Sequence, residues 1–170
     1  MDGLGAEELR AIQAPLKERY RKDPAAALIT LEAEGELDEG ITCSVKTGRA
    51  LVEAGLHPGT GGDGASACSG DMLLQALVAC AGVTMRAVAT SMGILVSGTV
   101  RAEGDLDWRG TLAVDKEARV GFSEIRLRFD LQSDASEDEL AALMRLTERY
   151  CVVFQTLANS PTLLVFCNRT

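Results

Sequence analysis

The stretch 71-DMLLQALVACAGVTMRAVATSMG-93 decides the fold of this chain, because it is long, apolar and free of proline. As a helix it would span about 35 Å. Its apolar residues occur on nearly every side, which is typical of a helix buried inside a protein. We therefore expect the rest of the chain to surround this helix, and Gly93 to end it. Cys80 lies near its middle and is the first candidate for chemistry.

The loop that leads into this helix, Gly55–Gly70, carries six glycines and His57, the only histidine. Its simplest interpretation is a tight connection in which Ser69 caps the helix. An anion site at the helix N-terminus is the alternative. A metal-binding or hydrolytic role for His57, together with Cys68 or Asp63, is a third hypothesis.

Upstream of this loop the sequence predicts a β-hairpin. Ile41, Cys43 and Val45 alternate with polar residues, as in a half-buried strand, so Cys43 is expected on the buried face. The predicted strands are Ala27–Gly35 and Gly40–Lys46, with Gly48–Ala54 as a candidate third.

Residues 1–25 are expected to form a helical extension outside the main domain, 26–170. Apolar residues recur at helical spacing over Ala6–Gln13 and Pro15–Lys22. Pro15 can start a helix but disfavours one that runs through it, so one helix or two remain open. Asp23-Pro24 is expected to end this segment.

Downstream of the long helix the pattern changes to strands and then returns to a helix. The expected elements are strands Ile94–Trp108 and Gly121–Gln132, a helix over Ser136–Leu157, and a buried last strand Thr162–Cys167. Ser136 and Glu139 form a capping-box pattern. The β-branched pair Val152-Val153 predicts a break near Tyr150-Cys151. Strands in runs, without regular alternation with helices, predict the α+β class.

The composition excludes several classes of function. A net charge of −8 without a long basic run argues against a nucleic-acid partner. Gln75, Gly82 and Arg86 interrupt the apolar helix, so we expect no membrane partner. The five cysteines are irregularly spaced, which favours free thiols in a reducing cytoplasm over a disulfide framework. No cofactor or metal is expected.

Two of the cysteines, Cys80 and Cys151, are predicted to lie in helices. A two-thiol site would require Cα atoms within about 6 Å of each other, which spacing along the chain does not establish. From the residues alone, two buried structural thiols remain the simpler interpretation.

The segment from about Ala27 to the C-terminus resembles the OsmC/Ohr family. The similarity rests on GDMLLQALVACAGVTMRAVATSMGI around Cys80, the strand pattern V-x-G-x-V at Val96–Val100, and LTERYCVVFQTL around Cys151. The resemblance implies an OsmC-like α+β fold in which antiparallel sheets surround the central helices of an intertwined homodimer. It also implies a thiol-dependent reductase of organic hydroperoxides, with Cys80 as peroxidatic and Cys151 as resolving cysteine, regenerated by a dithiol reductant.

One feature departs from the best-known branch of that family, which carries an Arg in the first hairpin loop and a Glu ten residues before the first cysteine. Here the loop is GELDEG, and Gly70 occupies the second position. Asp71 is the nearest acid, and Arg19 and Arg49 are candidate replacements for the missing Arg. Helix geometry places Asp71 and Arg86 away from Cys80. We therefore expect the group that activates Cys80 to come from another segment or subunit.

The alternative function is a non-catalytic OsmC-like module that binds a small hydrophobic or electrophilic ligand, with Cys80 lining the pocket. The missing Arg and Glu motivate this hypothesis. Formation of a Cys80–Cys151 disulfide under mild peroxide would distinguish the enzyme from the binding module.

Overall fold

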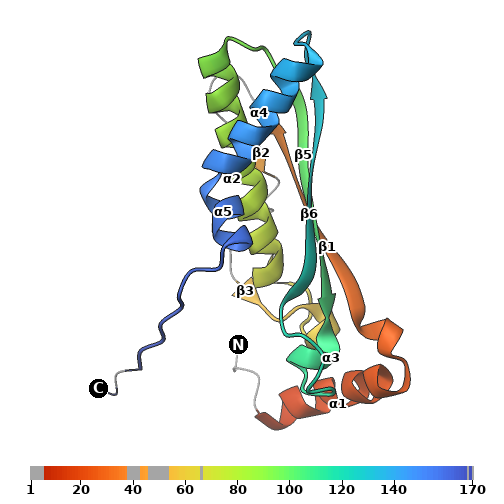
Figure 1. The fold of residues 1–170 in the computed structure, drawn as a ribbon. Helices are drawn as coiled ribbons and strands as arrows, with labels where there is room; N and C mark the ends of the chain where they lie inside the picture. Colours follow the sequence, from red (N-terminus) through yellow and green to blue (C-terminus); the bar gives the residue numbers. More distant parts are fainter. Residues whose placement is uncertain (1–5, 38–42, 46–53, 66, 168, 170) are drawn as a thin grey trace.

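This computed structural model describes residues 6–37, 43–45, 54–65, 67–167 and 169. A single antiparallel sheet carries a long central helix and two further helices on one face (Figure 1). The α+β class predicted from the sequence is therefore confirmed.

The sheet has four strands in the order β2-β1-β5-β6, and each neighbouring pair is antiparallel. Its strands are β1 (Leu28–Leu37), β2 (Cys43–Val45), β5 (Ser97–Asp107) and β6 (Phe122–Gln132). A separate parallel pair joins β3 (Ala54–Gly55) to β4 (Ala67–Cys68). The predicted hairpin and both long strands are confirmed, whereas most of the candidate third strand lies outside the described residues, as does the side chain of Cys43.

Gly98 explains why the strand pattern V-x-G-x-V contains glycine. Its φ of +136° lies in a region that L side chains rarely adopt. A Cβ placed on it would lie 2.0 Å from the backbone oxygen of Asp130 on β6. Gly98 pairs with Leu131 in the β5–β6 ladder, so glycine here permits close approach of the two strands.

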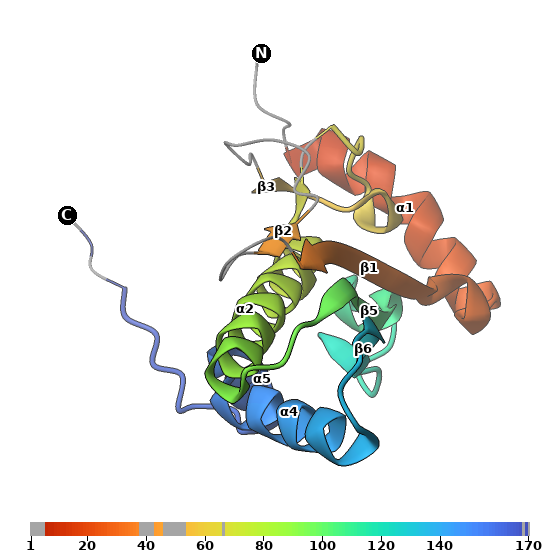
Figure 2. The same cartoon turned by 90° about the horizontal axis from the view of Figure 1, so that it is seen from above.

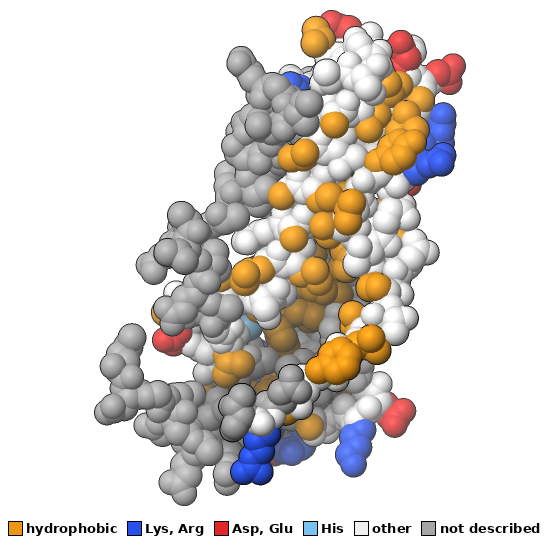
Figure 3. All heavy atoms as spheres, turned by 90° about the vertical axis from the view of Figure 1, so that its left-hand side faces the viewer, with side chains coloured by type: hydrophobic (Ala, Val, Ile, Leu, Met, Phe, Trp, Pro, Cys, Tyr) orange, Lys and Arg blue, Asp and Glu red, His pale blue; other side chains and the backbone are white. Residues whose placement is uncertain are grey.

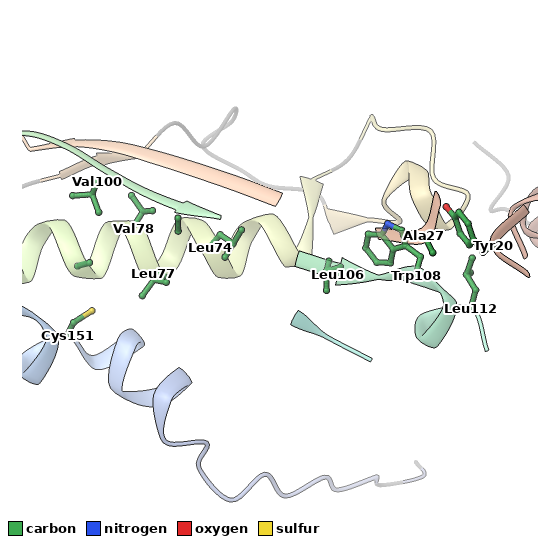
Figure 4. Packing of buried hydrophobic residues seen from close by; sticks show 12 residues of the cluster. Tyr20, Ala27, Leu74, Leu77, Val78, Val100, Leu106, Trp108, Leu112 and Cys151 are labelled. Carbon is green, nitrogen blue, oxygen red and sulfur yellow. The ribbon is translucent and has the colours of Figure 1, made fainter. Parts of the chain in front are cut away.

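The central helix α2 (Ser69–Met92) lies across the inner face of the sheet (Figures 1 and 4). Leu74, Leu77, Val78 and Met85 are buried along it. By length and hydropathy alone α2 would qualify as a membrane span, but these residues pack against the sheet and α4.

The two ends of α2 differ in how well the sequence predicted them. Gly93 ends the helix in the left-handed conformation, with φ of 69°, as expected. The predicted N-cap was wrong by one residue, because Cys68 occupies the cap position and Ser69 is already helical. Cys68 makes no side-chain capping hydrogen bond, so this start is fixed by the preceding strand β4 rather than by cap chemistry.

Two shorter helices, α4 (Glu137–Tyr150) and α5 (Val152–Ala158), pack on α2. Ser136 and Glu139 form the predicted capping box at the start of α4. The predicted break falls at Cys151, which belongs to neither helix. This corner places Cys151 opposite α2.

The N-terminal helix α1 (Ala6–Lys22) runs as a single helix through Pro15 and ends before Asp23-Pro24. Contacts on both sides of Pro15 hold it. The Gln13 amide donates to the Thr60 carbonyl at 3.1 Å, and the Tyr20 hydroxyl donates to the Gly59 carbonyl at 2.7 Å. Both acceptors belong to the short helix η2 (Pro58–Thr60), beside which α1 lies in Figure 2.

Two connections of the chain contain short helical turns. The turn η1 (Pro24–Ala27) leads from α1 into β1, and α3 (Trp108–Thr111) begins the connection from β5 to β6. Trp108 is buried between them and the loop of η2. The connection from β5 to β6 therefore begins with a helical turn.

The predicted last strand, Thr162–Cys167, is wrong. This segment has no secondary structure and points away from the fold (Figure 1). Its apolar side chains are exposed: Leu163 to 79%, Leu164 to 72%, Val165 to 94% and Phe166 to 82%. A strand needs a neighbour to accept its hydrogen bonds, and within the described residues of this chain the segment meets none. The apolar pattern of this segment therefore has no strand partner among the residues that the structure describes.

Candidate two-thiol site

The structure brings Cys80 and Cys151 together. Cys80 lies on α2 and is half-buried, whereas Cys151 is only 1% exposed. The Cys151 sulfur points toward α2 (Figure 4), and the two thiols lie close enough to shift each other's pKa. Both are free cysteines. The residues that sequence spacing alone could not join therefore form one site.

Local backbone geometry fixes the position of Cys151. Its N–H donates to the Thr147 carbonyl at 2.9 Å, which completes the last turn of α4. Its sulfur accepts from the N–H of Phe154 at 3.5 Å, which caps the first turn of α5. One residue thus ends a helix, begins the next and presents its thiol to Cys80.

The surroundings shift the pKa values of the two thiols in opposite directions. For Cys80, burial raises the pKa, but hydrogen bonds from the Val153 N–H, the Cys151 thiol and the Thr84 hydroxyl outweigh it, so the pKa is lowered overall. For Cys151, burial is the largest cause and the proximity of Cys80 adds to it, which raises the pKa to about 11. Cys80 is therefore the more acidic thiol of the pair, and Cys151 stays protonated at neutral pH.

The donors that lower the Cys80 pKa are neutral, whereas the sequence led us to expect a charged group near Cys80. Three arginines were named from the sequence. Arg86 donates to the Val96 carbonyl at 2.7 Å, Arg19 is exposed on α1, and Arg49 lies outside the described residues. Asp71 has a pKa raised by burial and lowered in part by His57. Among the described residues, the groups that lower the Cys80 pKa include the backbone N–H groups of Val152 and Val153 on α5 and the Thr84 hydroxyl on α2 itself.

Thr84, whose hydroxyl lowers the Cys80 pKa, was not predicted from the sequence as a residue of the site. It follows Cys80 by one turn of α2, and residues four apart share one face of a helix. A hydroxyl four residues after a helical cysteine is the sequence pattern that could have predicted this contact. No pattern in side chains could have revealed the backbone donors of α5, because they depend on how α5 packs on α2.

A mainly apolar cavity of about 600 Å³ opens between α2, α5 and β6, and its lining includes neither thiol. Leu77 and Phe154 form its inner wall, and each lies three residues from one of the thiols. Toward solvent the lining continues with Leu73, Leu157 and the first residues of β6. Figure 3 shows hydrophobic side chains gathered on the face that carries α2 and α5.

The contacts of His57 are those of a structural residue of the loop. His57 Nδ1 accepts a hydrogen bond from the Gly59 N–H at 2.9 Å, and the ring stacks on Trp108 at 5.1 Å between centroids. Asp63 accepts from the N–H of Ala65 at 2.9 Å. Within the described part of the chain, no group of three His, Cys, Asp or Glu side chains could hold a metal ion.

Comparison with known proteins identifies the family. The model of the OsmC-like protein family matches residues 61–165, which include both thiols and both helices of the site. This chain belongs to the OsmC-like family. The resemblance noted from the sequence is thereby confirmed.

Solved structures agree with the OsmC-like fold. An OsmC-like hydroperoxide resistance protein from Jannaschia sp. CCS1 is similar at a TM-score of 0.58 and 18% identity, covering 81% of this chain and 91% of that one. An OsmC-like protein from Mycoplasma pneumoniae is similar at a TM-score of 0.53 and 17% identity, covering 78% and 86% of the two chains. No curated protein matches in sequence.

Proposed function

We propose that this OsmC-like protein reduces organic hydroperoxides with Cys80 as the peroxidatic and Cys151 as the resolving cysteine. The observation that carries the proposal is the pair of neighbouring thiols: the corner between α4 and α5 holds Cys151 with its sulfur toward α2, and the two pKa values shift in opposite directions. The family and the similar protein that is named for hydroperoxide resistance support it.

The reaction balances with these two residues and one external reductant. The Cys80 thiolate attacks the distal oxygen of ROOH, the O–O bond breaks, and the alkoxide takes a proton to leave as an alcohol. Cys80 is then a sulfenic acid. The Cys151 sulfur attacks the Cys80 sulfur, an S–S bond forms, and the hydroxyl group leaves as water with the Cys151 proton. A dithiol then reduces the disulfide by exchange and is itself oxidised.

The protein contributes three things to this reaction. The amides at the start of α5 hold the thiolate in place without a mobile side chain. The corner at Cys151 keeps the second thiol in contact with the first. The mainly apolar cavity between α2, α5 and β6 would receive the organic part of the substrate, because removing apolar surface from water favours binding.

Turnover of cumene hydroperoxide with dithiothreitol tests the proposal. We expect Cys80→Ser to abolish turnover. Cys151→Ser should allow one equivalent of alcohol to form and then stop or slow, because no intramolecular thiol resolves the sulfenic acid. Cys68→Ser, a change of a half-buried thiol at the start of α2, is the matched control and should retain activity. Full turnover by Cys80→Ser would disprove the proposal.

A non-catalytic module that binds a small hydrophobic or electrophilic ligand is the second candidate. The groups that lower the Cys80 pKa in the described part of the chain are all neutral, which favours this candidate, because neutral donors stabilise a thiolate less strongly than a cation does. Intact mass under non-reducing conditions after one equivalent of hydroperoxide separates the two. Loss of two hydrogens, mapped to Cys80 and Cys151, supports the enzyme, and two intact thiols support the binding module.

We also propose that the protein is a homodimer. The apolar segment Thr162–Cys167 extends away from the fold, and Val83 on α2 and Val152 on α5 are 40% and 71% exposed. A second copy would cover this face and give the extended segment a partner for its hydrogen bonds.

A further inference from the structure

Thr147 on α4 carries a buried hydroxyl without a hydrogen-bond partner. The residue is 1% exposed, and its Oγ1 bonds to none of the residues that the structure describes. A threonine inside a helix commonly donates to the carbonyl one turn before it, as Thr90 on α2 does to Arg86 at 2.8 Å. A buried hydroxyl that lacks a partner destabilises a protein, so its presence calls for an explanation.

The packing of α4 on α2 places this hydroxyl at the level of the two-thiol site (Figure 1). Leu143, four residues before Thr147, packs in one cluster with Met85 of α2. Cys151, four residues after Thr147, packs in the other cluster with Ala81 of α2. Because residues four apart share one face of a helix, Thr147 lies across from the turn of α2 between Ala81 and Met85.

Helix geometry also places the hydroxyl on the same side as the Cys151 thiol. Side chains of a helix lean toward its N-terminus, so the later of two residues four apart lies over the earlier one. The Cys151 N–H donates to the Thr147 carbonyl at 2.9 Å, which completes this last turn of α4. No hydrogen bond joins the hydroxyl to the Cys151 sulfur while both cysteines are free thiols.

Each thiol of the site therefore has a threonine four residues away, but only one of the two hydroxyls is engaged. The Thr84 hydroxyl lowers the pKa of Cys80, whereas the Thr147 hydroxyl is uncommitted. In the reduced protein Cys151 is protonated, with a pKa of about 11, and has no charge to be stabilised. Resolution changes this, because Cys151 must give up its proton as it attacks the Cys80 sulfenic acid.

We infer that the Thr147 hydroxyl activates the resolving cysteine, by donating a hydrogen bond to the Cys151 sulfur as that thiol loses its proton. In this step the S–S bond forms, the S–O bond of Cys80 breaks, and the hydroxyl group leaves as water with the Cys151 proton. A donor that engages only the developing charge stabilises the transition state more than the ground state. The inference rests on the proposed function and adds a residue to its second step.

Competition between resolution and overoxidation tests the role of Thr147. A second molecule of cumene hydroperoxide oxidises the Cys80 sulfenic acid to sulfinic acid unless Cys151 resolves it first. Mass spectrometry gives the hydroperoxide concentration at which half of the protein ends as sulfinic acid. In Thr147→Val this concentration should fall about tenfold, the effect of one hydrogen bond to a charged group. Thr147→Ser keeps the hydroxyl and should behave as wild type.

The rate of the first step separates this role from a structural one. Loss of the free Cys80 thiol in a single turnover should be equally fast in wild type and Thr147→Val. Thr156→Val, at an exposed threonine of α5, is the control and should change neither step. The melting temperature of Thr147→Val should stay the same or rise, because the change removes an unpartnered hydroxyl. A lower melting temperature would contradict the premise that the hydroxyl has no partner.

The possible failures are distinguishable. Equal overoxidation of wild type and Thr147→Val would overturn the role of Thr147 and leave the proposed function intact. A slower first step in Thr147→Val would indicate a general structural effect and would also overturn that role. No oxidation of Cys80 by hydroperoxide in wild type would overturn the function itself.

Discussion

At Cys80 the thiolate is stabilised by dipoles that the fold holds in place. The Val153 and Val152 N–H groups and the Thr84 hydroxyl lower its pKa against the effect of burial. Hydrogen bonds to an ionised group are stronger than those between neutral groups. Because the donors are backbone amides and a short side chain, little conformational freedom is lost when the thiolate forms. Salt should affect this stabilisation less than it affects an exposed ion pair.

Thr84→Val tests the contribution of the hydroxyl. We expect the Cys80 pKa to rise by up to about one unit, the value of one hydrogen bond to a charged group. A raised pKa leaves less thiolate at neutral pH, so alkylation of Cys80 should slow there and recover at alkaline pH. Site-resolved alkylation by iodoacetamide across pH measures this, and in wild type Cys151 should react only toward its pKa of about 11.

Two further variants control for loss of structure. Thr84→Ser keeps the hydroxyl and should behave as wild type. Thr90→Val removes another hydroxyl of α2, which donates to the Arg86 carbonyl at 2.8 Å, and should not change the Cys80 profile. An unchanged profile in Thr84→Val would show that the hydroxyl does not stabilise the thiolate.

Among the elements, β5 sets the geometry of the sheet on which α2 rests. It pairs with β1 on one side and β6 on the other. Its outer face carries charged partners, such as Asp105, which Arg126 on β6 contacts and whose pKa is lowered to about 2 by that contact and by the Thr30 hydroxyl. Its inner face carries Val100 and Ala102 against α2. The entry into β5 at Gly98 fixes this register.

Gly98→Ala should destabilise the protein by about 2–4 kcal/mol, because the new Cβ meets a backbone oxygen that cannot move without breaking the ladder. Gly93→Ala is the comparison. Its φ is also positive, but a Cβ there meets nothing within 4 Å, so only the conformational cost of about 1 kcal/mol applies. Urea denaturation of both variants measures the difference, and equal losses would rule out the steric explanation.

For the whole molecule, the apolar segment near the C-terminus stands out because its side chains are exposed to solvent. Four consecutive apolar side chains, Leu163–Phe166, are between 72% and 94% exposed. Soluble monomers rarely leave a large contiguous apolar surface uncovered. The face over α2 and α5 in Figure 3 is apolar as well. A partner chain that covers both would explain them together.

Sedimentation at micromolar concentration tests the homodimer. We expect wild-type protein to sediment as a dimer. Replacement of Leu164 and Phe166 by Asp should shift it toward the monomer, because burying two unpaired carboxylates in an apolar interface is costly. Thr162→Asp, in the same exposed segment, should have the smaller effect. A wild-type monomer would contradict the proposed assembly.

The sequence predicted most elements because their signals are local. The apolar run of α2, the alternation in β6 and the capping box at Ser136 each depend on a few neighbouring residues. The continuity of α1 through Pro15 was not predictable, since its tertiary hydrogen bonds decide it. The absence of a strand over Thr162–Cys167 was not predictable either, because a strand forms only where a neighbouring strand can accept its hydrogen bonds.

The site was predictable only in part. Cys80 was a candidate from its place in the long helix, but its pairing with Cys151 and the two roles came from the resemblance, because spacing alone would not have paired them. The neutral donors were missed, because two of them are backbone amides whose positions follow from the packing of α5.

The dual position of Cys151 has a consequence for anyone who alters it. Its sulfur accepts the Phe154 N–H as the cap of α5 while its thiol faces Cys80. Alanine would delete both, so a loss of activity could come from a frayed helix as easily as from lost chemistry. Serine is a preferred capping residue and keeps the acceptor. In protein engineering terms, serine at this position separates architecture from reactivity, and alanine confounds them.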